Sequence, residues 1–309
     1  MAGVGIRYED VRGADGFRAP VHSGGVSMTD KLLVDNPVKG VRLLTMNHPE
    51  VLNALGDELL PALTEEVERF RTDPTARCLV ITGAGRGFSS GANVRGFAAR
   101  IDAADAAAGD QKPSTPWEDL DAMYTAREAE RGARGPQIVR SLHNLDKPSF
   151  AAVNGHAYGL GCGIAISCDF RVAAESARFN EAFIRNGLVP ADGSAWQLPK
   201  LVGMSQALWM QYSGLPIDGN EAYRIGLANW VTPDDQLMDF TLEKASLLAH
   251  GPVYAMGIVK QLIHQGYQQD LWEHLPLASR GQALTRLTDD HREGVQAFIQ
   301  KRAPEFTGH

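Results

Sequence analysis

The chain has 309 residues, 44% of them hydrophobic and 22% charged, and its formal net charge is −7. This composition is ordinary for a globular enzyme, and the length suffices for one large domain plus a smaller element. Lysine and arginine are scattered rather than gathered in a stripe, which argues against a nucleic-acid partner, because phosphate binding requires clustered cations.

Cysteine use and the distribution of apolar residues suggest the compartment. Cys78, Cys162 and Cys168 are too few and odd in number for a disulfide framework, and we expect buried thiols in a reducing cytoplasm. No run of about 18 apolar residues is present, so we expect no membrane span and no membrane partner. Residues 1–28 are glycine-rich and aperiodic, and we expect a disordered or flexible extension.

The first elements predicted after this extension are a strand over residues 41–46 and, beyond a loop over 47–55, an amphipathic helix. Asp73-Pro74 ends this helix, because proline cannot continue it. The apolar face of the helix consists of side chains three or four positions apart: Leu60, Leu63, Val67 and Phe70.

The middle of the chain alternates between strands and other segments. Residues 77–82 are almost continuously apolar, which is typical of a strand buried on both faces. An alanine-rich run with two prolines over 98–118 predicts a surface excursion, a candidate lid, followed by a helix over 119–145. Further strands are predicted over 149–153 and 169–174. Strands that alternate with helices predict an α/β fold.

The last part of the chain has a mostly helical pattern from residue 204 onward, with breaks at Gly214 and Pro233. We therefore expect an α/β core over residues 29–225 and a C-terminal helical region over 226–309.

Two glycine-rich turns, over residues 83–93 and 154–163, each follow a predicted strand. The first lacks the Lys-Ser/Thr pair of a P-loop, and the second has the spacing G-x-G-x-G rather than the dinucleotide spacing G-x-G-x-x-G. A strand that enters a helix through such a turn leaves the first N–H groups of the helix unpaired. Two adjacent turns can then direct two donors at one carbonyl oxygen as it gains negative charge. The alternative is that the glycines only allow tight packing.

Four segments in this chain resemble motifs of the crotonase superfamily, which includes enoyl-CoA hydratases and isomerases. They are 49–55, similar to the acyl-CoA-binding turn; 85–93 and 147–169, similar to the two oxyanion segments; and 293–302, similar to the closing helix. An aspartate usually stands where this chain has Asn93. The resemblance covers residues 32–306.

The resemblance implies a crotonase-like ββα spiral core and a C-terminal helical trimerisation region that builds a homotrimer or a dimer of trimers. It also implies an acyl-CoA substrate, with coenzyme A as part of the substrate and no bound cofactor. The two oxyanion donors would be the N–H groups of Ala92 and Leu160. Leu160 stands where the family usually has glycine; a leucine still donates an N–H, but it resists a positive φ.

The same resemblance assigns coenzyme A binding to two separate places. Val51, Asn53 and Ala54 lie in the acyl-CoA-binding turn. Phe298 and Lys301 match residues that in relatives reach the coenzyme A of a neighbouring subunit. The alternative for this last pair is a capping helix with a solvated lysine.

The chain departs from the family at two positions that carry chemistry. Hydratases of the family use two glutamates, one as the base on water and the other to deliver a proton. The matching positions here are Gly163 and Phe183, and neither side chain can move a proton. We therefore do not expect the standard two-glutamate hydration.

Two other carboxylates are candidates for the catalytic acid or base. Asp192 follows Phe183, and some relatives carry an aspartate here, including a carbon–carbon bond hydrolase that acts on diketones. Burial would raise the pKa of Asp192 and suit it to proton transfer. The alternative is that Asp192 belongs to a turn before a capping box over 194–197. Glu181 is the second candidate; the alternative is that it is solvated or ion-paired and has no catalytic role.

The nine histidines are dispersed and form no cluster with cysteine, so we expect no metal site. The predicted function is an acyl-CoA-processing enzyme that stabilises a thioester enolate and catalyses isomerisation, hydration by an unusual acid–base set, or hydrolysis. Two alternatives remain: a non-catalytic acyl-CoA-binding homologue, and a carbon–carbon bond hydrolase of the same fold.

Overall fold

The central strands form where the sequence is most continuously apolar. The computed structural model describes residues 30–56, 58–92 and 137–308. β2 (Val41–Met46) and β5 (Ser149–Val153) have the predicted bounds, whereas β3 (Cys78–Gly83) and β7 (Phe170–Ala174) each begin one residue later than predicted. Every residue of β3 and β5 is buried, as expected for parallel strands covered on both faces.

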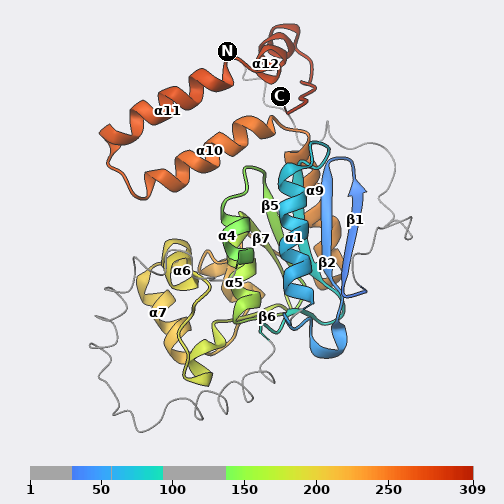
Figure 1. Ribbon diagram of the computed structural model, residues 1–309, viewed down its shortest axis with the longest axis vertical. Coiled ribbons are helices and arrows are strands. Elements are labelled where there is room, and N and C mark those ends of the chain that lie inside the picture. Colours follow the sequence, from blue (N-terminus) through green and yellow to red (C-terminus); the bar gives the residue numbers. More distant parts are fainter. Residues whose placement is uncertain (1–29, 57, 93–136, 309) are drawn as a thin grey trace.

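Two sheets are formed by the described residues (Figure 1). The other strands are β1 (Leu32–Val38), β4 (Gly87–Ser89), β6 (His156–Tyr158), β8 (Arg178–Asn180), β9 (Ile217–Asp218) and β10 (Trp230–Thr232). The larger sheet has the order β1-β2-β3-β5-β7-β10, in which only the β1–β2 pair is antiparallel. The smaller sheet has the order β4-β6-β8-β9, in which β8 and β9 are antiparallel.

Each of three strands of the larger sheet is followed within a few residues by a strand of the smaller one: β3 by β4, β5 by β6, and β7 by β8. α5 (Leu160–Ser167) follows β6 and completes a ββα unit. This succession confirms the predicted α/β class with its ββα core. Since β3 pairs with β5 and β4 with β6, the two glycine-rich turns lie side by side at the ends of neighbouring units.

The first predicted helix is α1 (Leu59–Thr72), which ends directly before Asp73 as expected. Leu63, Val67 and Phe70 on its predicted apolar face are fully buried. Of the helix predicted over 119–145, the described part is α4 (Gln137–His143). The predicted flexible extension over 1–28 and the candidate lid over 98–118 lie outside the described residues.

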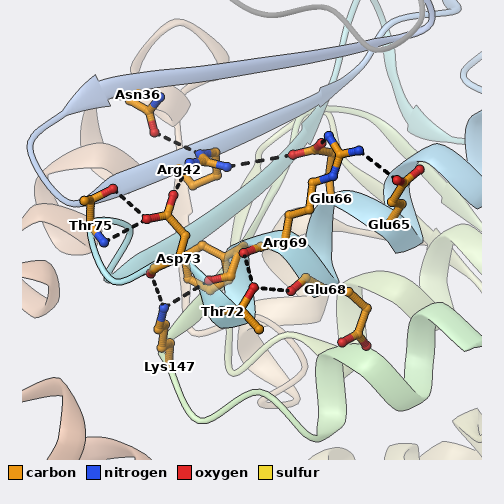
Figure 2. Close-up of polar contacts among 11 residues, drawn as sticks. Asn36, Arg42, Glu65, Glu66, Glu68, Arg69, Thr72, Asp73, Thr75 and Lys147 are labelled. Carbon is orange, nitrogen blue, oxygen red and sulfur yellow. Dashed lines mark hydrogen bonds and ion pairs between the residues drawn. The ribbon is translucent and has the colours of Figure 1, made fainter.

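A polar network fixes α1 against β2 and the start of β5 (Figure 2). Arg42 on β2 forms an ion pair with Asp73 at 2.8 Å and lies 3.8 Å from the buried Glu66 of α1. Lys147, just before β5, donates hydrogen bonds to the carbonyls of Phe70 and Asp73 at the end of α1. Three elements that are distant in sequence are therefore held together at the edge where β5 begins.

The chain after residue 204 is mostly helical, as predicted, and Gly214 (φ +57) ends α7 (Met204–Ser213). The short strands β9 and β10 interrupt this region, and the helical pattern did not predict them. β10 joins the larger sheet beside β7, and α9 (Leu237–Ala249) packs on β3 and β5, so the layers of the sheet continue beyond residue 225.

The last three helices lie beyond these layers, and α10 and α11 lie side by side (Figure 1). In the described part of the chain, none of the helices has the length and apolar character needed to cross a membrane. The remaining helices are α6 (Ser194–Val202), α8 (Gly219–Arg224), α10 (Val253–Gly266), α11 (Leu271–Thr285) and α12 (Asp289–Gln300), with short 3₁₀ helices η2 (Pro49–Val51), η3 (Ala182–Asn186) and η4 (Asp234–Gln236).

Candidate active site

The two glycine-rich turns are in direct backbone contact. A Cβ added to Gly91 (φ +86) would lie 2.4 Å from the carbonyl oxygen of Tyr158 and 3.4 Å from the backbone nitrogen of Leu160. A Cβ added to Gly161 would lie 2.5 Å from the carbonyl oxygen of Ser89. Both distances to oxygen are too short for any side chain, so glycine at 91 and 161 is what lets the first turn approach the N-terminus of α5.

The two amides that the sequence singles out lie in these turns. Leu160 is the first residue of α5, and the positive φ of the turn (+49) falls on Gly159, so the leucine does not have to adopt a left-handed conformation. Ala92 pairs with Leu55 in an isolated parallel bridge. Among the described residues, no acceptor takes a hydrogen bond from the N–H of Ala92 or of Leu160. Within the described residues, both N–H groups are therefore available to donate a hydrogen bond to a substrate oxygen.

The predicted coenzyme A-binding turn packs against the first glycine-rich segment. Asn53 is fully buried; its side chain accepts a hydrogen bond from His48 N (2.7 Å) and donates one to the Gly87 carbonyl (2.7 Å). This side chain is committed to holding the turn together. Ala54 is half-buried and Val51 is exposed, so these residues present the accessible part of the turn.

Asp192 lies against the first helix turn of α5. A Cβ added to Gly163 would lie 2.1 Å from Asp192 Oδ2, so the carboxylate occupies the space into which a side chain at position 163 would extend. Leu160 and Gly163 are three residues apart on one helix, which puts them on the same face with an axial rise of about 4.5 Å. The carboxylate of Asp192, which comes from the loop before α6, therefore fills the space that glycine leaves empty at position 163.

One oxygen of Asp192 is tied down and the other is not. Oδ1 accepts a hydrogen bond from the backbone N–H of Ser194 at 3.0 Å. Oδ2 is buried and has no hydrogen-bond partner among the described residues. Burial raises the pKa of Asp192, and the Ser194 hydrogen bonds partly oppose this.

Glu181 is connected to Asp192 through Ser194, whose hydroxyl donates to Glu181 Oε2 at 2.7 Å. Glu181 is 1% exposed, and burial raises its pKa to about 7. The nearby Asp192 carboxylate adds to the rise, whereas hydrogen bonding by Ser194 and Cys162 lowers the pKa. The structure therefore brings both predicted carboxylates together as a buried pair.

The interpretation of residues 194–197 as a capping box is wrong. The N-cap of α6 is Gly193, which has no side chain, and the N–H of Ser194 at this helix end is bonded by Asp192 instead. The Ser194 hydroxyl instead contacts Glu181, and Gln197 donates to the hydroxyl of Ser167 at the far end of α5 (3.0 Å). Ser194 is the site residue that sequence reasoning missed, because the same Ser-x-x-Gln pattern is typical of a helix cap.

Phe183 brings an apolar ring to the turn instead of a carboxylate. A Cβ on Gly159 would lie 3.8 Å from Phe183 Cζ, so the ring covers the entry to α5. It reduces the exposure of this region to water and strengthens electrostatic interactions there.

Phe298 and Lys301 are not near the two turns in this chain. Phe298 is 83% exposed on α12, and Lys301 is the C-cap of the same helix, with φ +55. α12 lies far from β6 and the start of α5 (Figure 1). These residues can contribute to a site of this kind only in another copy of the chain. In the described residues, no group of three or more His, Cys, Asp or Glu side chains could hold a metal ion.

Comparison with known proteins identifies the family of this chain. The family model described as "Enoyl-CoA hydratase/isomerase" matches residues 37–117 and 115–309. The 1,2-epoxyphenylacetyl-CoA isomerase of Escherichia coli is 35% identical, with 90% of this chain and 99% of that protein covered. The 2,3-dehydroadipyl-CoA hydratase of the same organism is 36% identical, with coverage of 87% and 95%. The crystal structure of an enoyl-CoA hydratase from Bacillus anthracis has a TM-score of 0.75 at 28% identity, with coverage of 90% and 100%.

Proposed function

The chain belongs to the enoyl-CoA hydratase/isomerase family, and we propose that it isomerises the double bond of an acyl-CoA through a thioester enolate. In this proposal the N–H groups of Ala92 and Leu160 bind the thioester oxygen as it becomes negative. Asp192 takes a proton from one carbon of the acyl group and returns it to another.

The unpartnered oxygen of Asp192 is the observation that carries the proposal. A buried carboxylate with one fixed and one free oxygen is held in a defined orientation and can still exchange a proton. It lies against Gly163, three residues after Leu160 on α5. The raised pKa brings the carboxyl closer to the range in which proton transfer in both directions is efficient.

Isomerisation is favoured over hydration because it needs only one carboxylate at the acyl group. Hydration requires one group to activate water and another to protonate the α-carbon. Gly163 and Phe183 supply neither. Glu181 has one oxygen bonded to the Ser194 hydroxyl and one buried oxygen without a partner among the described residues, and in this proposal it does not touch the acyl group. We assign Glu181 as a positioning residue whose hydrogen bond to Ser194 orients the backbone N–H that fixes Asp192.

In this proposal, coenzyme A binds at the positions that the resemblance to the family implies. The turn containing Val51, Asn53 and Ala54 binds the thioester end, with the backbone rather than the Asn53 side chain as the binding group. Phe298 and Lys301 reach the coenzyme A of a neighbouring copy in a homotrimer or a dimer of trimers. Three buried free cysteines fit a reducing cytoplasm.

The second candidate function is carbon–carbon bond hydrolysis, because an aspartate at this position also occurs in a hydrolase of this fold. The same Asp192 oxygen would then protonate a carbon leaving group after attack by water. A panel of enoyl-CoA, dienoyl-CoA and β-diketone substrates distinguishes the candidates by product. Isomerisation gives a product of unchanged mass, whereas hydration and hydrolysis each add 18 Da, and hydrolysis of a non-cyclic diketone yields two fragments.

The panel also tests whether the chain is catalytic at all. A shifted double bond in at least one enoyl- or dienoyl-CoA product supports the proposal. Tight binding of acyl-CoA without turnover of any member would contradict it and favour the non-catalytic homologue. Turnover of diketones alone would favour the hydrolase.

A further inference from the structure

A cavity of about 630 Å³ lies outside the candidate active site, between α6, α10 and the C-terminal end of α5. The eight residues of α5 span about 12 Å, so the cavity and the Leu160 amide lie at opposite ends of this helix. The volume is in the range of small-molecule sites. Its walls are mostly apolar and include Ile166, Leu201, Leu248, Met256, Val259 and Ile263.

The charged side chains that line the cavity are mostly positive. The cations are Lys147, Arg171, Lys200 and Lys260, and the anion is Asp169. Three of these cations are already engaged. Lys260 pairs with Asp169 at 2.8 Å, and Lys147 and Arg171 donate to backbone carbonyls. Lys200 has no hydrogen-bond or ion-pair partner within the part of the chain that the structure describes.

Lys200 is instead held by aromatic rings. Its ammonium group lies over the indole of Trp196 and 5.3 Å from the ring centroid of Tyr267 on the segment after α10. Such contacts orient a cation without neutralising it. One full positive charge therefore faces a largely apolar cavity without a compensating carboxylate among the described residues.

Two histidines stack beside this charge. The rings of His143 on α4 and His264 on α10 are nearly parallel, with centroids 4.3 Å apart, and His143 also meets Trp196 edge to face. Burial is the main cause that lowers the pKa of both, and Lys200 and Lys260 lower it further, whereas Asp169 opposes this. Both rings are therefore predominantly neutral at pH 7, and because they are stacked, a proton on His264 further lowers the pKa of His143.

We propose that this cavity binds a fatty-acid anion, with the alkyl chain along the apolar walls and the carboxylate at Lys200 and the stacked histidines. A single uncompensated lysine fits a single negative charge. At pH 8, where both imidazoles are neutral, a phosphate monoester with two charges would lack the second cation that it needs. Because a bound carboxylate favours the imidazolium form, binding takes up protons and strengthens as the pH falls from 8 to 6.

The test is calorimetric titration of the full-length protein with dodecanoate. We expect one saturable site per chain, about tenfold weaker in Lys200→Met because a charge-assisted contact is lost. Lys39→Met, on the exposed β1–β2 turn, removes the same charge away from the cavity and leaves binding unchanged. Ala255→Phe, which adds a ring inside the cavity, abolishes binding, and Asp192→Asn has no effect on it.

Each control probe can overturn the proposal. Dodecyltrimethylammonium binding as tightly as dodecanoate would show that the charge is irrelevant, and tighter binding of dodecyl phosphate at pH 8 would contradict the choice of carboxylate. Full affinity in Ala255→Phe would place the ligand elsewhere. Thermal denaturation by circular dichroism confirms that each variant is folded, and a folded Lys200→Met variant with unchanged affinity would also refute the proposal.

Discussion

At the scale of single residues, Gly163 and Asp192 form a complementary pair. Asp192 Oδ2 lies where a Cβ at position 163 would be, at 2.1 Å, so the glycine and the buried aspartate depend on each other. This pairing gives a physical reason for a glycine at the first position where the family's hydratases have glutamate. A glutamate here would collide with the carboxylate that we assign to proton transfer.

Gly163→Ala therefore costs about 1–3 kcal/mol of unfolding free energy, because an added methyl group in a packed site forces the carboxylate to move. Urea denaturation measures this cost, and turnover falls with it. The matched control is the same substitution in an Asp192→Ala background, where the methyl group no longer meets an oxygen and the cost largely disappears. An equal cost in both backgrounds would contradict the pairing.

Glu181 makes folding stability depend on pH. Its pKa rises from an ordinary value of 4.5 to about 7 on folding, so the folded chain holds a proton that the unfolded chain releases. The resulting stabilisation is fully present below pH 4.5 and is lost as the pH rises through 7. It amounts to roughly 3 kcal/mol.

The test is urea denaturation between pH 5 and 8. We expect Glu181→Gln to lose less stability than the wild type over this interval, because glutamine stays neutral and can keep the contact with Ser194. Asp192 contributes a change of the same sign in both proteins, so the difference between them isolates Glu181. Parallel pH profiles would show that Glu181 has an ordinary pKa.

At the scale of elements, the β2–α1–β5 network ties the sheet to α1 at the end where β2 and β5 begin, opposite to the glycine-rich turns. Arg42→Met removes the cation from between Asp73 and Glu66, and we expect a loss of about 1–3 kcal/mol in unfolding free energy. Arg224→Met is the matched control, since it breaks an exposed ion pair with Glu221 and should change stability little. Equal effects of the two substitutions would show that burial of the network is unimportant.

Of the strands in the described residues, β2, β3, β5 and β7 could be predicted, as could α1, because their signals are local, whereas β1, β4, β6 and β8 were missed. β3 and β5 are almost continuously apolar runs, and α1 repeats its apolar face until Asp73-Pro74 ends it. β9 and β10 were not predicted because strands of two or three residues carry too few side chains for a periodic pattern. Their pairing depends on β8 and β7, which are distant in sequence.

From the sequence, the site could be predicted as a list of candidate residues but not as an arrangement in space. The glycine-rich turns indicated two oxyanion donors, the resemblance to the family assigned them to Ala92 and Leu160, and the aspartate that some relatives carry at the matching position indicated Asp192. The Ser194 bridge to Glu181 and the contact of Asp192 with Gly163 join residues 13 and 29 positions apart, and such contacts depend on how α5 and α6 pack. A sequence pattern alone does not contain that packing.

At the scale of the whole molecule, the last helices expose apolar side chains that a folded monomer usually hides. Phe298 and Ile299 on α12 are 83% and 72% exposed, and Trp272 on α11 is 78% exposed. This supports the proposed trimeric assembly, in which the neighbouring copy covers these helices and receives Phe298 and Lys301.

Light scattering should therefore give the mass of a trimer or hexamer for the wild type. Phe298→Asp should lower the mass at the same protein concentration and weaken coenzyme A binding, because a buried charge opposes the interface. Lys301→Ala should weaken coenzyme A binding without changing the mass. A wild-type protein that is monomeric at micromolar concentration would contradict the assembly.

The most direct test of the central claim, that Asp192 moves a proton at an enolate held by two amides, is deuterium incorporation. The wild-type enzyme and Asp192→Asn are incubated in D₂O with an enoyl-CoA that the wild type turns over, and the acyl group is analysed by mass spectrometry. We predict deuterium in the wild-type acyl group, because the protonated Asp192 carboxyl exchanges with D₂O in part of the turnovers before it reprotonates the enolate. We predict a rate lower by about 10²–10⁴-fold in Asp192→Asn, with acyl-CoA affinity retained. Deuterium incorporation at an equal rate in both proteins would contradict the account.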